Sequence, residues 1–290
     1  MTIIPLPRMR TLSIGNTPLV MGILNCTPDS FYPGGRAESC AAAVRQAREM
    51  ISSGADILDI GGESSRPGSA PVSLSTELDR VLPVLNEVRT FSDIPISVDT
   101  RKSEVAHRAL LAGADIINDI SALQEDPEKA DIAAEHGAAL VLMHMRGTPA
   151  TMQVSPFYVD PVGEVLKELE AAVEVACKAG VPKNSIILDP GIGFAKRLED
   201  NIAVLRGIPR LRASGFPILI GHSRKSFLGA LLADEDGNVR PVEARLAGGL
   251  AVSLFAATHG AEILRVHDVA ETVDALRVGL FLSSPGESDR

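Results

Sequence analysis

Acidic, amide and cationic side chains stand directly after short apolar runs at eight places along the chain. Asp99, Asn118 and Asp189 each end such a run, where burying a carboxylate or an amide without a partner is costly. A carboxylate accepts two parallel hydrogen bonds, so these side chains suit a ring with adjacent N–H donors, such as a 2-amino-pyrimidinone edge. The sequence therefore predicts a site for a small polar ring.

Positive charge follows other runs of the same kind. Residues 223–226, which include Lys225, should open a helix whose free backbone N–H groups could hold a carboxylate or a phosphate. Arg265 and His267 alternate at the end of the last run and can point the same way. With Arg66, for which a solvated surface position is an equally good interpretation, these cations predict an anion site beside the ring.

The apolar runs have the length of strands and alternate with longer stretches of helical spacing. Strands are expected at residues 19–25, 56–61, 95–99, 115–119, 138–144, 185–189, 217–221 and 262–267. Helices are expected at residues 39–53, 75–90, 102–112, 162–179, 201–212, 244–259 and 269–277. This alternation predicts a parallel α/β sheet, and eight couplets predict a (β/α)₈ TIM barrel with its chemistry at the C-terminal ends of the strands.

We expect a single domain, because no low-complexity linker interrupts the chain. Residues 1–18 form an N-terminal extension, in which residues 3–13 can make a hairpin across the barrel floor. Residues 19–282 form the catalytic barrel and residues 283–290 a solvated tail. Aromatic residues are only 3% of the 290 and Trp is absent, so the core must be aliphatic, as in parallel barrels.

Charge and cysteine content exclude several classes of partner. A formal net charge of -9 argues against binding to nucleic acid, which attracts basic surfaces. No apolar stretch is long enough to span a membrane, and the first residues lack the layout of a signal peptide. Cys26, Cys40 and Cys177 are scattered, which fits a reducing compartment. We therefore expect a cytoplasmic protein whose partners are small molecules, with Cys26 as a buried filler rather than a nucleophile.

Taken in order, the segments around the ends of the eight runs resemble the dihydropteroate synthase family of pterin-binding barrels. The matching segments are residues 21–31, 61–68, 97–100, 118–120, 142–145, 188–191, 223–226 and 265–268. The resemblance implies transfer of 6-hydroxymethyl-7,8-dihydropterin from its pyrophosphate ester to para-aminobenzoate, giving 7,8-dihydropteroate and pyrophosphate in folate biosynthesis. It also implies a Mg²⁺ cofactor, a homodimer and a sulfonamide target.

The same resemblance assigns roles to individual residues. The implied pterin contacts are Asp99, Asn118, Met143, Asp189 and Lys225. The implied pyrophosphate contacts are Asn25, Arg265 and His267, and Asn25 is also the implied ligand of Mg²⁺, which needs few protein ligands where phosphate supplies the others. The implied para-aminobenzoate contacts are Ser65, Pro67, Phe194 and Ser226. The implied catalytic residues are Asp99, Lys225, Asp29 and Arg66, the last two on loops that close over the substrates.

Three positions depart from the family pattern: Ser65 replaces a more usual Thr, Cys26 a β-branched residue, and Gly249 a Ser or Thr near the helices through which the family commonly dimerises. Two other functions remain open. A methyltetrahydrofolate–corrinoid methyltransferase could share the pterin-binding Asp and Asn residues, but it would not need the cations at residues 223–226 and 265–267. A non-catalytic pterin-binding barrel would be expected to lack site residues, and none is missing.

Overall fold

The computed structural model describes residues 1–27 and 36–283. Eight parallel strands are hydrogen-bonded in the order β8-β7-β6-β5-β4-β3-β10-β9, and a bridge between Leu188 and Ile218 joins β8 to β9 and closes the sheet. The strands are β3 (Leu19–Asn25), β4 (Ile57–Gly61), β5 (Ile96–Asp99), β6 (Ile116–Asp119), β7 (Ala139–Met143), β8 (Ile186–Asp189), β9 (Leu219–Gly221) and β10 (Ile263–Val266). The predicted TIM barrel is confirmed, with all eight strands inside the expected ranges.

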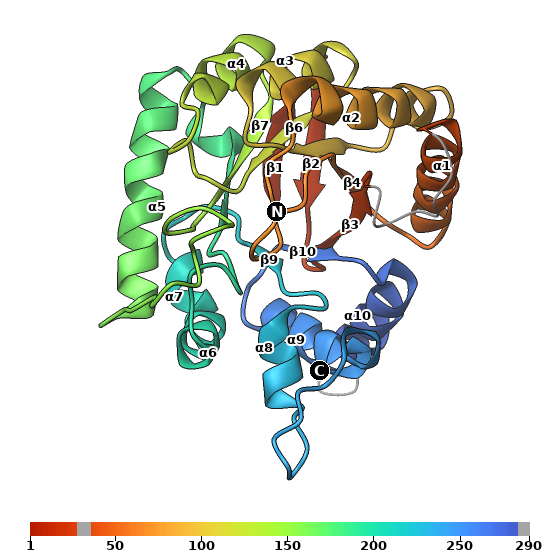
Figure 1. Cartoon of the computed structure of the whole chain (residues 1–290). Coiled ribbons are helices and arrows are strands. Elements are labelled where there is room, and N and C mark those ends of the chain that lie inside the picture. The colour runs from red at the N-terminus through yellow and green to blue at the C-terminus, as the bar shows by residue number, and fades with distance from the viewer. Residues whose placement is uncertain (28–35, 284–290) are drawn as a thin grey trace, which may run out of the picture.

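Helices surround the barrel on its outer face (Figure 1). They are α1 (Arg36–Ser52), α2 (Leu74–Arg89), α3 (Ser103–Leu111), α4 (Glu128–His136), α5 (Pro161–Lys178), α6 (Leu198–Arg206), α7 (Ile208–Arg212), α8 (Ser226–Leu231), α9 (Leu246–Thr258) and α10 (Val269–Ser283). Among the described residues, none of these helices has both the length and the apolar character that crossing a bilayer requires.

The predicted helices differ from the observed ones in three places. The single helix expected at 201–212 is two, because Pro209 lies in the first turn of α7 and has no N–H for the preceding turn. No range was predicted for helix α4, which has nine residues. The helix expected to open at residues 223–226 is α8, which begins at Ser226 and is six residues long. Helix α10 runs six residues beyond the expected end at 277, to Ser283. The predicted tail beyond it lies outside the described residues.

Along each strand, successive side chains face the barrel interior and the surrounding helices in turn. On the floor of the interior, Met21, Ile57, Ile187 and Ile263 belong to one buried cluster. Toward the C-terminal end polar interior residues appear, beginning with Asp59 on β4, beside the apolar Val141 and Met143 of β7. The interior is therefore apolar at the floor and more polar at the top, where the site is expected.

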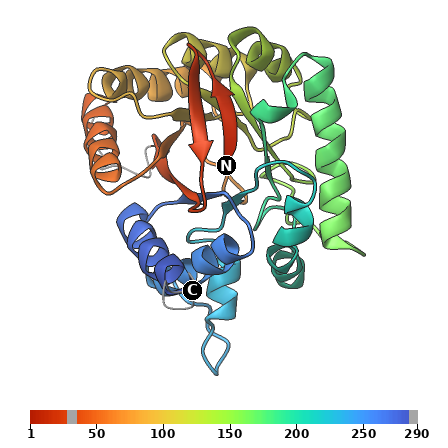
Figure 2. The same cartoon turned by 180° about the vertical axis from the view of Figure 1, so that it is seen from behind.

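An antiparallel hairpin of β1 (Thr2–Leu6) and β2 (Arg10–Ile14) lies across one end of the barrel (Figure 2). Its buried residues join the floor cluster of the barrel. They are Ile4, Leu6, Leu12 and Ile14. The predicted hairpin over the floor is thereby confirmed. It closes the end of the barrel opposite to the polar strand ends.

Ionic contacts fasten the hairpin to the barrel. The Asp115 carboxylate, which is fully buried, accepts hydrogen bonds from Arg8 (2.6 Å) and Arg10 (2.8 Å) of the hairpin and from Arg89 of α2 (2.7 Å). Its second oxygen also accepts the N–H of Ile96 at 2.9 Å. One acidic side chain just before β6 thus joins three elements that are far apart in the sequence.

Candidate functional site

A cavity of about 760 Å³ lies at the C-terminal ends of the strands. Its lining comes from the ends of β3, β9 and β10 and from the loops after β4, β7, β8 and β9. Nine of the residues assigned from the sequence line it: Asn25, Ser65, Arg66, Pro67, Phe194, Lys225, Ser226, Arg265 and His267. Residues that are up to 242 positions apart in the chain are therefore brought to one place, because every strand end of a parallel barrel opens on the same side.

Asp99 and Asn118 lie beneath this cavity and are linked to it through Arg265. The Arg265 side chain spans two carboxylates: its Nε donates to Asp59 at 2.6 Å and an Nη to Asp99 at 2.7 Å. Asp59 in turn accepts the Asn118 amide at 3.2 and 3.3 Å. The two carboxylates thus accept from the Asn118 amide and the guanidinium, and the four side chains form one buried network across β4, β5, β6 and β10.

Burial and the neighbouring charges shift the titration of this network. Burial raises the pKa of Asp99 to about 7; the Arg265 charge opposes this shift and the Asp59 carboxylate adds to it. Burial also disfavours the charge on Arg265, but Asp59 and Asp99 together raise its pKa above the ordinary value. The guanidinium therefore stays charged, and Asp99 is a carboxyl group whose proton affinity depends on what lies beside it.

Two glycines leave room where the polar side chains converge. A Cβ atom at Gly61 would lie 3.6 Å from the Cβ of Asp99 and 4.0 Å from Oδ1 of Asn25. At Gly221 a Cβ would lie 3.7 Å from the carboxylate of Asp189 and 3.8 Å from both Arg265 and the Lys225 ammonium. Each glycine therefore keeps open a space bounded by the side chains that the sequence assigned to the substrates.

Lys225 connects the acidic and aromatic parts of the site. Its ammonium donates to the carbonyl oxygen of Ile192 and lies 4.4 Å from the centre of the Phe194 ring. Burial lowers the pKa of Lys225 to about 7, although the Asp189 carboxylate favours the charged form. Burial likewise raises the pKa of Asp189, opposed by Lys225 and by the Gly191 N–H, which donates to the carboxylate at 2.7 Å. The two opposite charges therefore act on each other beside Gly221.

His267 differs from the sequence-based expectation of a cation. Its Nδ1 lies 3.1 Å from the Ser223 hydroxyl, whose oxygen also accepts the His267 N–H at 3.2 Å. Burial lowers the pKa of His267 to about 3, and Arg224 and Arg265 lower it further. At neutral pH the ring is therefore uncharged, so it can offer an anion a hydrogen bond but not a charge.

Met143 lies in a small buried cluster with Phe194 and Met152, which line the cavity on the side of the loops after β7 and β8. Behind this cluster the fully buried Lys196 donates to the carbonyl oxygens of Gly191 (3.0 Å) and Phe194 (3.1 Å). It thus fixes the loop that carries the aromatic ring.

The Lys196 ammonium has a further partner on the side of α5. It lies 3.0 Å from Nδ1 of His144, whose Nε2 is 2.9 Å from the Glu168 carboxylate. Burial lowers the pKa of Lys196 to about 7 and that of His144 to about 4. A chain of three titratable side chains therefore backs the loop without lining the cavity.

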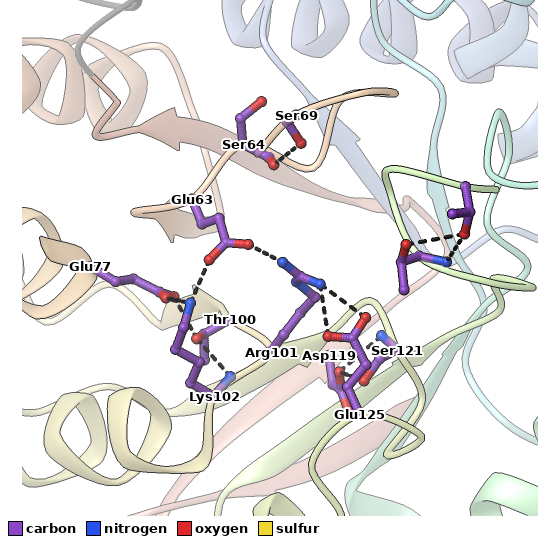
Figure 3. A network of polar contacts seen from close by, with 12 residues as sticks. Glu63, Ser64, Ser69, Glu77, Thr100, Arg101, Lys102, Asp119, Ser121 and Glu125 are labelled. Atoms are coloured by element: carbon purple, nitrogen blue, oxygen red, sulfur yellow. Dashed lines mark hydrogen bonds and ion pairs between the residues drawn. The ribbon is translucent and has the colours of Figure 1, made fainter. Parts of the chain in front are cut away.

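The loop after β4 carries Ser65, Arg66 and Pro67 to the rim of the cavity. Figure 3 shows the base of this loop, where Glu63 contacts Arg101 and Lys102 of the loop after β5. The exposed tip of the loop therefore extends from a fixed base. Asp29, assigned to the loop after β3, lies outside the described residues.

Two of the departures from the family pattern have little consequence for the site. Cys26 is buried, and burial raises the pKa of its thiol to about 12, as expected of a filler rather than a nucleophile. A Cβ atom at Gly249 would meet nothing within 4 Å, while the Gly249 carbonyl oxygen lies 3.0 Å from Nε2 of His222. A larger residue would therefore fit at position 249.

The sequence missed Asp59 and Lys196. Asp59 stands in the middle of an expected strand, within the apolar run of residues 57–60. A carboxylate in such a run could have indicated a site residue, because side chains alternate between the two faces of a strand and this one faces the barrel interior. Lys196 lies in a loop after β8, and nothing in its sequence neighbourhood indicates burial. Its partner His144 lies 52 positions away.

Asn25 supplies one amide oxygen to the cavity, beside the Asp99 carboxylate across Gly61. Within the described ranges, no three His, Cys, Asp or Glu side chains are grouped as metal ligands. This donor set does not form a cage for a cation. It fits Mg²⁺ where the oxygens of a bound phosphate complete the coordination.

Comparison with known proteins identifies the family. The model of the pterin binding enzyme family matches residues 21–267. A curated relative, dihydropteroate synthase of Synechocystis, is 48% identical over 275 residues, which cover 94% of this chain and 93% of the relative.

Solved structures agree with this match. Xanthomonas albilineans dihydropteroate synthase with 4-aminobenzoic acid superposes with a TM-score of 0.88 at 43% identity, covering 97% of this chain and 99% of the other. The Burkholderia cenocepacia dihydropteroate synthase complexed with 7,8-dihydropteroate gives a TM-score of 0.85 at 43% identity, covering 97% and 96%. Since the family model spans nearly the whole barrel and the relatives match end to end, this chain belongs to the pterin-binding enzyme family.

Proposed function

We propose that this chain is a dihydropteroate synthase, a transferase that joins 6-hydroxymethyl-7,8-dihydropterin pyrophosphate to para-aminobenzoate and releases pyrophosphate. The observation that carries the proposal is the junction of two unlike groups of side chains at one cavity. Buried carboxylate and amide groups lie beneath it, and Lys225, Arg265 and His267 line it. The first group complements the N–H edge of a pterin and the second complements a pyrophosphate.

The pterin would lie over Asp99, Asn118 and Asp189, with Met143 beside it and Lys225 near the ring. Departure of pyrophosphate leaves positive charge on the methylene carbon, and the ionised Asp99 would stabilise that charge. Burial raises the pKa of Asp99, but the neighbouring Arg265 charge opposes this shift and favours the ionised form that this role requires. We assign Asp99 and Lys225 to catalysis on this basis.

The pyrophosphate would be held by Asn25, Arg265 and His267. Arg265 is held between Asp59 and Asp99, so its guanidinium is oriented before the anion arrives. The neutral His267 would donate one hydrogen bond. Asn25 would ligate Mg²⁺, which supplies charge neutralisation to the leaving group when bound.

The para-aminobenzoate would stack between Phe194 and Pro67, with its carboxylate near Ser226 and a hydroxyl contact from Ser65. The amine then attacks the methylene carbon. The loops of Asp29 and Arg66 would close over both substrates and exclude the water that competes for the cationic carbon. Sulfonamides, as mimics of the aryl amine, are expected to compete at this subsite.

We further propose a cytoplasmic homodimer. The exposed apolar side chains of α10 support an interface: Val278, Phe281 and Leu282 are 59%, 81% and 76% exposed. Leu246 of the neighbouring α9 is also exposed. Light scattering on the purified protein should give twice the chain mass, and Phe281→Arg should shift it toward the monomer. A wild-type monomer at micromolar concentration would contradict this.

The test of the function is turnover. Purified protein is incubated with 6-hydroxymethyl-7,8-dihydropterin pyrophosphate, Mg²⁺ and para-aminobenzoate, while dihydropteroate and pyrophosphate are followed. We expect both products to require both substrates and to fall sharply in Lys225→Ala. Binding of pterin without turnover would replace the proposal with a methyltransferase or a non-catalytic barrel. Failure to bind pterin would remove the site assignment altogether.

A further inference from the structure

The base of the loop after β4 is held by a cluster of charged side chains outside the cavity. Figure 3 shows this Glu63 cluster, which consists of Glu63, Glu77, Arg101, Lys102 and Glu125. The Glu63 carboxylate bonds to both Arg101 and Lys102. Lys102 also bonds to Glu77 at 2.5 Å, and Arg101 bonds to Glu125 at 2.7 Å. Each cation thus joins Glu63 to a second carboxylate.

The cluster is largely shielded from water, which makes its geometry specific. The Glu63 side chain is only 8% exposed, and the Glu77 side chain is fully buried. Burial alone would raise the pKa of Glu63, but the hydrogen bonds from Lys102 and Arg101 hold it below the ordinary value. The carboxylate is therefore ionised at neutral pH, and its two cationic partners fix where it lies.

Backbone contacts fix the same loop on both sides of its tip. A Cβ at Gly62 would lie 2.8 Å from Val81 and 2.9 Å from Glu77, so the loop begins against α2. Beyond the tip, the Gly68 N–H donates to the carbonyl oxygen of Pro149 at 3.0 Å. The exposed Arg66 and Pro67 lie between these fixed ends.

The partners of Glu63 come directly after β5. Asp99 ends that strand, and Thr100 leads to Arg101 and Lys102. The Thr100 hydroxyl donates to Glu77 at 2.6 Å, which joins this turn to α2 as well. The Glu63 cluster therefore connects the strand end that carries the buried Asp99 to the loop that carries Ser65, Arg66 and Pro67.

We propose that Glu63 is a positioning residue for the aryl amine: through Arg101 and Lys102 it sets the position of Ser65 and Pro67 relative to Asp99. The inference rests on the proposed roles of those residues. Without the ionised carboxylate the loop keeps its contacts at Gly62 and Gly68, so the barrel still folds, but the base of the loop loses its link to the turn after Asp99 and the tip can shift relative to that strand end. The affinity for para-aminobenzoate should fall while pterin binding is retained.

The test compares Glu63→Gln with Glu125→Gln in the full-length chain. Gln has nearly the same shape as Glu but no charge, and Glu125 is the outer, more exposed partner of Arg101. For Glu63→Gln we expect the KM for para-aminobenzoate to rise about tenfold, as for loss of a charge-assisted hydrogen bond. The Kd of the pterin pyrophosphate should change by less than about twofold. Glu125→Gln should leave both within about twofold.

Three outcomes would overturn the inference: an unchanged KM, an equal loss of affinity for both substrates, or a lower melting temperature as the only effect. If Glu63→Gln does not fold, Lys102→Met and Arg101→Gln each remove one partner, and the same split between the two substrates is expected of each. Wild-type protein that shows no turnover would refute the proposed function instead, since that result does not involve Glu63.

Discussion

Asp59 lies in the middle of a strand and holds two side chains that are proposed to bind substrate, those of Asn118 and Arg265. It accepts the Asn118 amide and holds Nε of Arg265 at 2.6 Å, and it is fully buried. Asp59→Asn keeps the size but removes the charge, so the guanidinium loses one of two carboxylate partners. We expect kcat/KM for the pterin pyrophosphate to fall roughly 10- to 100-fold.

Steady-state kinetics, with inorganic pyrophosphate as a competitor, checks this prediction. Asp131→Asn on the exposed surface of α4 is the control and should behave as wild type. If Asp59→Asn retains wild-type kcat/KM, Asp59 only fills the barrel interior and does not position Arg265.

Lys196 offers a second test, in the pH dependence of stability. Burial lowers its pKa to about 7 in the folded protein from 10.5, so between these values the unfolded chain binds more protons. The free energy of unfolding should therefore rise with pH across that window, as the cost of burying the ammonium disappears. In Lys196→Met the rise from pH 7 to 9 should be smaller by about 2 kcal/mol.

Urea unfolding at pH 7, 8 and 9 measures this difference. The exposed Lys178, near the end of α5, provides Lys178→Met as a control that should keep the wild-type slope. Equal slopes in Lys196→Met and wild type would show that the buried amine keeps its ordinary proton affinity.

At the scale of elements, the hairpin depends on one carboxylate. Asp115 is fully buried and bonds Arg8, Arg10 and Arg89. Asp115→Asn should lower the free energy of unfolding by about 3 kcal/mol, since it leaves cations uncompensated at the barrel floor. Glu104→Gln breaks an exposed pair on α3 and should cost less than about 0.5 kcal/mol.

Urea unfolding and amide hydrogen exchange together test this prediction. Exchange should accelerate first in β1 and β2, because the hairpin loses ionic contacts while its apolar contacts with the floor remain. If the two variants prove equally stable, hydrophobic packing alone holds the hairpin.

The elements also show how far sequence reasoning extends. Strands were predictable because each is a short apolar run that ends in a polar residue, as at Asp99 and Asp189. Helix α4 was missed because the side chains it buries are Lys129, Ala130 and Ala133, which form no clear apolar pattern, although Gly137 has φ 62° and closes it in the left-handed conformation. The break before α7 could have been expected from Pro209 alone.

The convergence of the assigned residues was predictable for a related reason, since the barrel brings the strand ends together whatever lies between them. The side chains that hold those residues in place were not predictable. Asp59 meets Arg265 across 206 positions of sequence, and Glu63 meets Arg101 across 38. Such partners are set by the register of neighbouring strands and by loop packing, which the sequence pattern does not specify.

At the scale of the whole molecule, three buried histidines make stability sensitive to acid. Burial lowers the pKa of His144 and His222 to about 4 and that of His267 to about 3, from 6.5. As pH falls below 6.5 the unfolded chain takes up protons that the folded protein resists, so each histidine lowers the free energy of unfolding. Asp99 has the opposite effect on the free energy of unfolding. Burial raises its pKa to about 7, so the folded protein takes up this proton more readily than the unfolded chain as pH falls.

A variant at His222 separates these opposing contributions. The side chain is fully buried against α9, where Nε2 lies 3.0 Å from the Gly249 carbonyl and 2.9 Å from the Ser253 hydroxyl. His222→Asn removes the titrating ring, so the decrease in unfolding free energy from pH 6.5 to 4 should be about 3 kcal/mol smaller than in wild type. Urea unfolding at pH 6.5, 5 and 4 gives the two slopes, and their difference does not depend on any overall loss of stability in the variant. Parallel slopes would mean that His222 has the same proton affinity in the folded and unfolded states.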